Sequence, residues 1–272
     1  MKIYLMTDLE GVAGVIDFEN WCFPDGRYYE DGRRLLTLEV NAAVDGFLAG
    51  GATEIVVADG HGYGAVNIEL LDPRAKLMRG WPTGYPLLLD KTYDALAFVG
   101  QHAKAGTEFA HLAHTGDVDA IDWSINGISI GELGKTAMCA SELGIRTIFA
   151  SGDEALTKEA QALLPGIETV SVKTGTTPGK GDELPYLAYQ KRNTSAIHLQ
   201  PVKAREQIRS GALKAVQRAQ KEKFGLIPLK PPFERVVVFR SDRMNPVGTY
   251  RHTHPDSVSA LLNTPFHRTT VV

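Results

Sequence analysis

The stretch Met1-Lys2-Ile3-Tyr4-Leu5-Met6-Thr7-Asp8-Leu9-Glu10-Gly11 opens the chain and decides how the rest of it is interpreted. Its first seven residues are mostly apolar and predict a buried strand. Side chains alternate along a strand, so Asp8 and Glu10 are expected on the same side at its end. Two carboxylates there repel each other unless a cation lies between them, and a metal ion is the simplest candidate. The alternative is a strand that ends in two solvated acids.

The composition limits the class of protein. The chain has 272 residues, of which 43% are hydrophobic, enough for one large domain or for one domain with an appendage. A net charge of -3 argues against a general binder of nucleic acids or anionic membranes. Cys22 and Cys139 form no CxxC motif and fit a reducing compartment. Without a signal-peptide pattern or an apolar run of transmembrane length, we expect a soluble cytoplasmic protein that binds no membrane.

Strands and helices are expected to alternate along the first two thirds of the chain. Further strands are expected at 54–59, 77–80, 95–100, 146–150 and 168–173, and helices at 28–48, 131–143 and from a cap at 151–153 to about 164. Asn126-Gly127 predicts the turn of a hairpin over 122–130. This order predicts an α/β fold with a largely parallel sheet flanked by helices.

The last third is expected to form a smaller α+β portion. Its expected elements are a helix at about 200–222, a strand at 235–240, a polar loop at 245–255 that includes His252-Thr253-His254, a short helix at 256–263 and a strand at 268–272. We therefore expect residues 1–195 to form an α/β metal-binding catalytic domain. Residues 196–272 are expected to form a C-terminal α+β subdomain, either separate or packed as part of the same domain.

Five side chains of metal-binding type are expected at one edge of the sheet. His61 and His102 each follow a predicted strand, and Glu132 follows the hairpin and opens a helix. In open α/β sheets the functional crevice lies outside the carboxyl ends of the strands, where such residues converge with Asp8 and Glu10. Taken singly, such a histidine is usually an ordinary loop residue, and Glu132 suits a helix N-terminus. Together, imidazoles and carboxylates without thiolate suit two divalent ions bridged by one carboxylate, for which Asp8 is the natural candidate.

The order of short motifs adds a resemblance to a known family. The motifs are Asp8-Leu9-Glu10-Gly11, Tyr29-Glu30-Asp31-Gly32-Arg33, Asp59-Gly60-His61, Asn67, Gly100-Gln101-His102-Ala103-Lys104-Ala105-Gly106, His114-Thr115, Asn126-Gly127 and Gly131-Glu132-Leu133-Gly134. With this order and spacing over about residues 1 to 172, the chain resembles the DppA-like D-aminopeptidases, a family of zinc peptidases. The C-terminal third matches the family poorly.

The resemblance implies a role for each of the five residues. Asp8 would bridge two zinc ions in each chain. Glu10 and His61 would complete one zinc site, and His102 and Glu132 would complete the other. These are the same residues that the strand ends bring together.

The resemblance also implies an activity and an assembly. His114 matches the position of the family's catalytic residue, while His111, three residues earlier, is the rival for that role. The implied activity is hydrolysis of the N-terminal residue of short peptides, with D-amino-acid peptides or amides as the expected substrates. The implied assembly is a homodecamer.

Two other functions remain open at this point. Phosphatases of the haloacid-dehalogenase type also begin with an apolar strand, which ends in Asp-x-Asp-Gly where this chain has Asp8-Leu9-Glu10-Gly11. They use Mg²⁺ without histidine ligands, which would leave His61 and His102 unexplained. A metal-stabilised binding or assembly protein without turnover would keep the metal ligands and tolerate the loss of His114.

Overall fold

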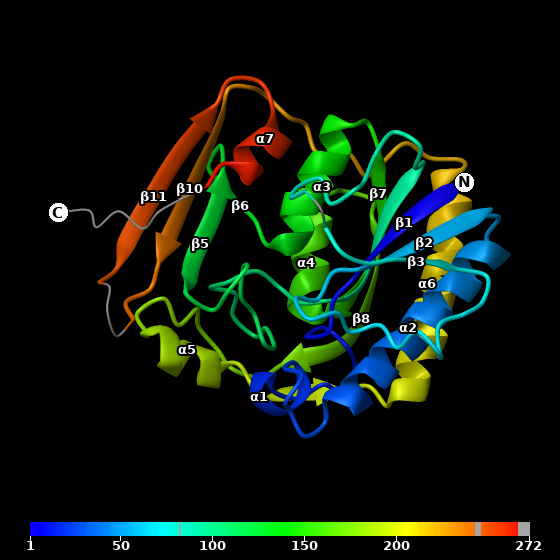
Figure 1. The fold of residues 1–272 in the computed structure, drawn as a ribbon, viewed down its shortest axis with the longest axis horizontal. Helices are drawn as coiled ribbons and strands as arrows, with labels where there is room; N and C mark the ends of the chain where they lie inside the picture. The colour runs from blue at the N-terminus through cyan, green and yellow to red at the C-terminus, as the bar shows by residue number, and fades with distance from the viewer. Residues whose placement is uncertain (82, 243–245, 266–272) are drawn as a thin grey trace.

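The computed structural model describes residues 1–81, 83–242 and 246–265 (Figure 1). Its strands are β1 (Lys2–Thr7), β2 (Glu54–Asp59), β3 (Lys76–Met78), β4 (Ala95–Gln101), β5 (Ala120–Ile125), β6 (Ile128–Ser129), β7 (Arg146–Asp153), β8 (Glu168–Gly175), β9 (Ala196–His198), β10 (Phe233–Phe239) and β11 (Gly248–His254). Its helices are α1 (Phe18–Trp21), α2 (Tyr29–Ala49), α3 (Glu132–Glu142), α4 (Glu154–Leu163), α5 (Tyr186–Arg192), α6 (Pro201–Ala219) and α7 (Val258–Asn263).

The large sheet has the strand order β3-β2-β1-β4-β7-β8-β9. Its strands are parallel except β9, which pairs antiparallel with β8. Thr7 pairs with Asp59 on one side and with Val99 on the other, so β1, β2 and β4 end at the same edge. After β1 the chain builds outward through β2 and β3 and then crosses to β4, which makes this edge a topological switch point. The expected α/β fold with a largely parallel sheet is confirmed.

Helices cover both faces of the large sheet (Figure 1). α2 and α6 pack against each other on one face, where Ile3 and Leu5 of β1 join their apolar side chains. α3 and α4 cover the other face, where Tyr4 and Met6 point. β1 is therefore buried on both sides, which explains its continuous apolar sequence.

The second sheet is antiparallel and has the strand order β11-β10-β5-β6. Asn126 and Gly127 form the predicted β5–β6 turn with φ of 50° and 76°, and β6 delivers the chain to the start of α3. This sheet joins the two expected units, since β5, which precedes residue 195, pairs with β10, which follows it. α6, which also follows residue 195, packs on α2. The division of the chain at 195 into two units stays a prediction.

One expected element is wrong, and one lies outside the described residues. Residues 248–254 form strand β11, whereas a polar loop was expected at 245–255. β11 lies at the edge of the sheet and buries only Gly248 and Tyr250, so its sequence lacks the apolar alternation of a core strand. The strand expected at 268–272 lies outside the described residues. Among those residues, no helix combines the length and the apolar character that crossing a membrane requires.

Candidate functional site

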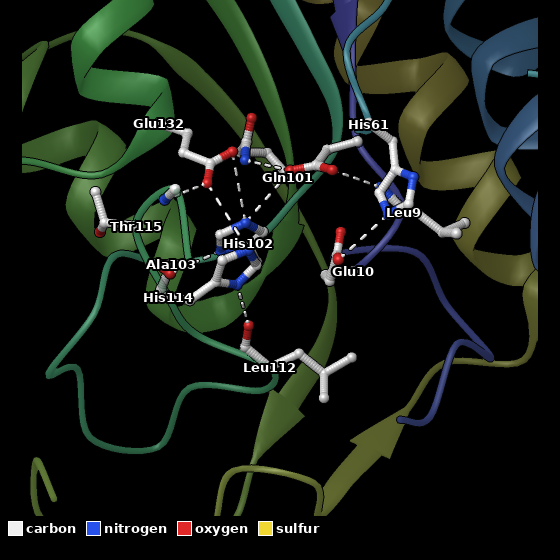
Figure 2. A network of polar contacts seen from close by, with 12 residues as sticks. Leu9, Glu10, His61, Gln101, His102, Ala103, Leu112, His114, Thr115 and Glu132 are labelled. Atoms are coloured by element: carbon white, nitrogen blue, oxygen red, sulfur yellow. Dashed lines mark hydrogen bonds and ion pairs between the residues drawn. The ribbon is translucent and has the colours of Figure 1, made fainter. Parts of the chain in front are cut away.

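The five expected metal-binding residues meet at the carboxyl edge of the large sheet. Figure 2 labels four of them, Glu10, His61, His102 and Glu132. Asp8 and Glu10 follow β1, His61 follows β2, and His102 follows β4. Glu132 arrives from another direction, as the first residue of α3 after the β5–β6 hairpin. Parallel pairing of three strands and one antiparallel hairpin together bring these side chains to one place.

Asp8, Glu10 and His61 form the first cluster of side chains. Each of the three residues is buried, and each offers a ligand atom within 4.8 Å of the others. His61 Nε2 lies 3.4 Å from Glu10 Oε1. Glu10 Oε2 and His61 Nδ1 are buried without a hydrogen-bond partner among the described residues. Unpartnered polar atoms of this kind are costly in a folded protein unless something else binds them.

His102, His114 and Glu132 form the second cluster. His102 Nε2 lies 3.8 Å from Glu132 Oε2, and His114 Nε2 lies 3.8 Å from Glu132 Oε1. The two imidazole rings stack with centroids 3.9 Å apart. Sequence reasoning placed His114 beside the metal ligands, and the structure places it within the second cluster.

Backbone carbonyls orient both histidines of the second cluster. His102 Nδ1 lies 2.9 Å from Ala103 O, and His114 Nδ1 lies 2.9 Å from Leu112 O (Figure 2). A carbonyl can only accept, so Nδ1 carries a proton in both rings, and Nε2 is the nitrogen left to bind a metal ion or a second proton. Nε2 is the atom that faces Glu132 in each case. This tautomer is the one that a metal ligand or a general base requires.

Asp8 connects the two clusters. Its Oδ2 lies 3.3 Å from His102 Nε2 and accepts a hydrogen bond of 2.7 Å from Gln101 Nε2, while Leu9 N donates to Oδ1. Burial, together with the nearby charge of Glu10, raises the pKa of Asp8 to about 7. Burial beside Glu10 therefore disfavours the ionised form of Asp8. Cations bound on both sides of this carboxylate would stabilise that form, so Asp8 is suited to bridge two of them.

The histidines also respond to the surrounding carboxylates. Burial lowers the pKa of His61, but Glu10 and Asp8 outweigh it and raise the pKa to about 9. Burial likewise opposes protonation of His102, yet Asp8 and Glu132 raise its pKa to about 10. Burial disfavours ionised Glu10, but His61 holds its pKa well below the usual range. The site therefore favours positive charge, and its oxygen and imidazole donors without thiolate suit divalent metal ions.

Sequence reasoning missed several residues that hold these side chains in place. The Asp59 carboxylate accepts hydrogen bonds from Ala65 N and Val66 N and pairs with Arg79 at 2.7 Å, which fixes the loop that carries His61. An acid at a strand end next to a glycine-rich loop is the available signal. Gln101, which orients Asp8, lies beside His102 in a matched motif and could have been found there.

Lys173 gave no signal in the sequence. It lies in β8 and is 2% exposed, and its Nζ donates to the carbonyls of Glu10, Val12 and Val15. A lysine within a strand usually faces solvent. Only the tertiary structure shows that this one fixes the loop after β1.

His111 does not lie in either cluster. Its Nε2 is 3.0 Å from Ile16 O, and its ring packs edge-on against His198 with centroids 5.3 Å apart. Burial and the charge of Lys173 hold its pKa far below the ordinary value. Between the two histidines of this loop, the structure brings His114 to the clusters and gives His111 a place in the packing.

Both clusters open into one pocket of about 310 Å³. The pocket is lined by Asp8, Glu10, Gly60, His61, Gly62, Tyr63, Tyr85, His114, Gly116, Glu132 and Lys135. A pocket of this size with convergent polar groups suits a small ligand rather than a long chain.

Known proteins are similar to this chain in sequence and in fold. Residues 1–251 match the model of the D-aminopeptidase family. The chain belongs to the D-aminopeptidase family. It is therefore a peptidase and a hydrolase, and the match extends beyond residue 172, where the short motifs could no longer be followed.

Two relatives illustrate the membership. A D-aminopeptidase of Bacillus subtilis (strain 168) is 30% identical over 236 residues, which are 85% of this chain and 78% of the relative. The Zn-dependent D-aminopeptidase DppA from Bacillus subtilis, a self-compartmentalizing protease, has the same fold with a TM-score of 0.81. That likeness covers 97% of this chain and 95% of the other at 23% identity. The phosphatase and the protein without turnover find no support in this family.

Proposed function

We propose that this chain is a dinuclear zinc aminopeptidase that releases the N-terminal residue of short peptides or amides by hydrolysis. The N-terminal residue of these substrates is a D-amino acid. Membership of the D-aminopeptidase family supports the reaction, and the Zn-dependent relative supports the metal. The observation that carries the proposal is the contact of Asp8 with His102, which joins two clusters of carboxylates and imidazoles in one pocket.

The unpartnered atoms of the site fit two ions. Glu10 Oε2, His61 Nδ1 and His102 Nε2 are buried without hydrogen-bond partners among the described residues. We assign Asp8, Glu10 and His61 to one zinc ion, and Asp8, His102 and Glu132 to the other. Two bound zinc ions would supply a water of near-neutral pKa and polarise the peptide carbonyl.

His114 is suited to move the proton in this reaction. Burial and the neighbouring positive charge of His102 lower the pKa of His114, which favours the neutral ring. Its Nδ1–H donates to Leu112 O, which leaves Nε2 free to accept a proton. His114 would take a proton from the attacking water at Nε2 and return it to the nitrogen of the leaving amine.

The proposed assembly is a homodecamer in the cytoplasm. The self-compartmentalizing character of the B. subtilis relative supports an oligomer, and this chain matches 95% of that structure. Light scattering on the purified protein would test the proposal, with a mass of about ten times the 29.6 kDa chain expected. A monomer at micromolar concentration would contradict it.

Metal analysis combined with a substrate comparison tests the function. We expect about two zinc ions per chain and faster hydrolysis of D- than of L-aminoacyl substrates. Asp8→Ala should lose both ions and the activity, because it removes the shared ligand. Asp90→Ala, which removes an exposed acid bonded to Thr92, is the matched control and should keep both. Zinc-free protein that remains active, or protein that binds only Mg²⁺, would reject the proposal.

A further inference from the structure

Lys135 is the lysine among the described residues that line the pocket, which contains no arginine. It lies on α3, one turn after Glu132, so the two side chains share a face of the helix. It is 4% exposed, although lysine is rarely buried without a partner. The proposed hydrolysis assigns it no role.

The ammonium group of Lys135 packs against one aromatic ring. Its Nζ lies 3.7 Å from the centre of the Trp123 ring, which stabilises the positive charge. Among the described residues it makes no hydrogen bond or ion pair, and the Glu132 carboxylate is not within 4 Å. A ring face accepts one direction of approach, so N–H donors of the ammonium remain available to a ligand.

Gly116 keeps the approach to this ammonium open. It lines the same pocket with a φ of +80°, and a Cβ at this position would lie 3.6 Å from Lys135 Nζ. A glycine therefore stands where a side chain would take up the space beside the ammonium. In the metal-free protein, burial lowers the pKa of Lys135 to about 8 against the opposing effect of Glu132 and Asp119, which favours the ammonium form at pH 7.

We propose that Lys135 binds a carboxylate of the substrate, namely the free C-terminal carboxylate of a short peptide, and so selects such peptides over their amides. This inference rests on the proposed aminopeptidase function. A short peptide whose N-terminal residue reacts at the metal ligands needs a group for its other end, and a pocket of about 310 Å³ limits the distance between the two. A buried ammonium binds a carboxylate through charge-assisted hydrogen bonds, which are stronger than its hydrogen bonds to a neutral amide.

The test compares D-alanyl-glycine with D-alanyl-glycinamide as substrates. Lys135→Met keeps an unbranched side chain against Trp123 and removes the charge. We expect kcat/KM for the dipeptide to fall roughly 10- to 100-fold, mainly through KM, while kcat/KM for the amide changes little. Lys135→Arg should retain part of the preference for the dipeptide. Lys158→Met is the matched control, because Lys158 is an exposed lysine on α4 that pairs with Glu154 at 2.7 Å.

The outcomes separate this inference from the function on which it rests. If the wild type hydrolyses neither substrate, the proposed function fails. If it hydrolyses both and Lys135→Met leaves their ratio unchanged, Lys135 does not bind the carboxylate, and the aminopeptidase function stands. An equal loss on both substrates also overturns the inference, because Lys135 would then support the fold or the metal site rather than the carboxylate.

Discussion

His114 is the residue whose role the geometry defines most narrowly. It stacks on His102 and faces Glu132, so it is close enough to act either as a ligand or as a proton carrier. In the proposed assignment, Asp8, His102 and Glu132 would provide three ligands for one ion, the usual number in a catalytic zinc site. We therefore expect His114→Ala to keep its metal and to lower kcat about 10³-fold, the typical contribution of a general acid–base group.

Elemental analysis and kinetics on the same preparation test this expectation. His252→Ala is the control, because His252 lies on β11 in the second sheet and stacks on Tyr250. Loss of one zinc ion from His114→Ala would make His114 a ligand instead. Near-normal turnover with intact metal would remove it from the mechanism.

The loop after β1 shows how one buried residue orders an element of the site. Lys173 donates to the carbonyls of Glu10, Val12 and Val15, which reach β8 from the loop. Lys173→Met would leave these buried acceptors unpaired, so we expect the free energy of unfolding to fall by about 3 kcal/mol and zinc binding to weaken. Urea denaturation and zinc titration would measure the two effects. Lys214→Met, which removes an exposed partner of Glu168, should change neither, and equal stability of both variants would contradict this role.

The strands and the strand ends of the site were predictable because their signals are local. An apolar run followed by Asp8, and another followed by Gln101-His102, need no knowledge of the fold. Parallel pairing then implies that these ends converge. Glu132 was predictable for a second local reason, because Asn126-Gly127 fixes the hairpin that delivers it.

The elements that escaped prediction depend on tertiary partners. β11 is polar on one face and is a strand because β10 pairs with it. β9 has three residues and gains its order from antiparallel pairing with β8. Lys173 is of a residue type that usually lies at the surface. It is buried here because three backbone carbonyls of the loop after β1 accept hydrogen bonds from its ammonium group. Such features arise from long-range contacts that periodicity does not record.

For the whole molecule, we expect the site to make stability depend on both pH and bound metal. In the metal-free protein the pKa values of His61 and His102 rise from 6.5 to about 9 and about 10. A histidine pKa that is raised by folding adds stability that is full below about pH 6.5 and is lost as the pH rises through the folded values. We therefore expect the Tm of the metal-free protein to fall between pH 6.5 and about 9.

We expect bound zinc to reverse this trend, because a metal on these two imidazoles would displace their protons. Each displaced proton makes apparent zinc affinity rise about tenfold per pH unit below the histidine pKa. At a fixed free zinc concentration, the increase in Tm on adding zinc should therefore be larger at about pH 8.5 than at about pH 6.5. His61→Gln removes one of the two imidazoles that release a proton when zinc binds. The effect of zinc on Tm should therefore depend less steeply on pH in this variant. Calorimetry with and without a chelator would measure this dependence, and an equal zinc effect at both pH values would mean that metal does not displace protons from these histidines.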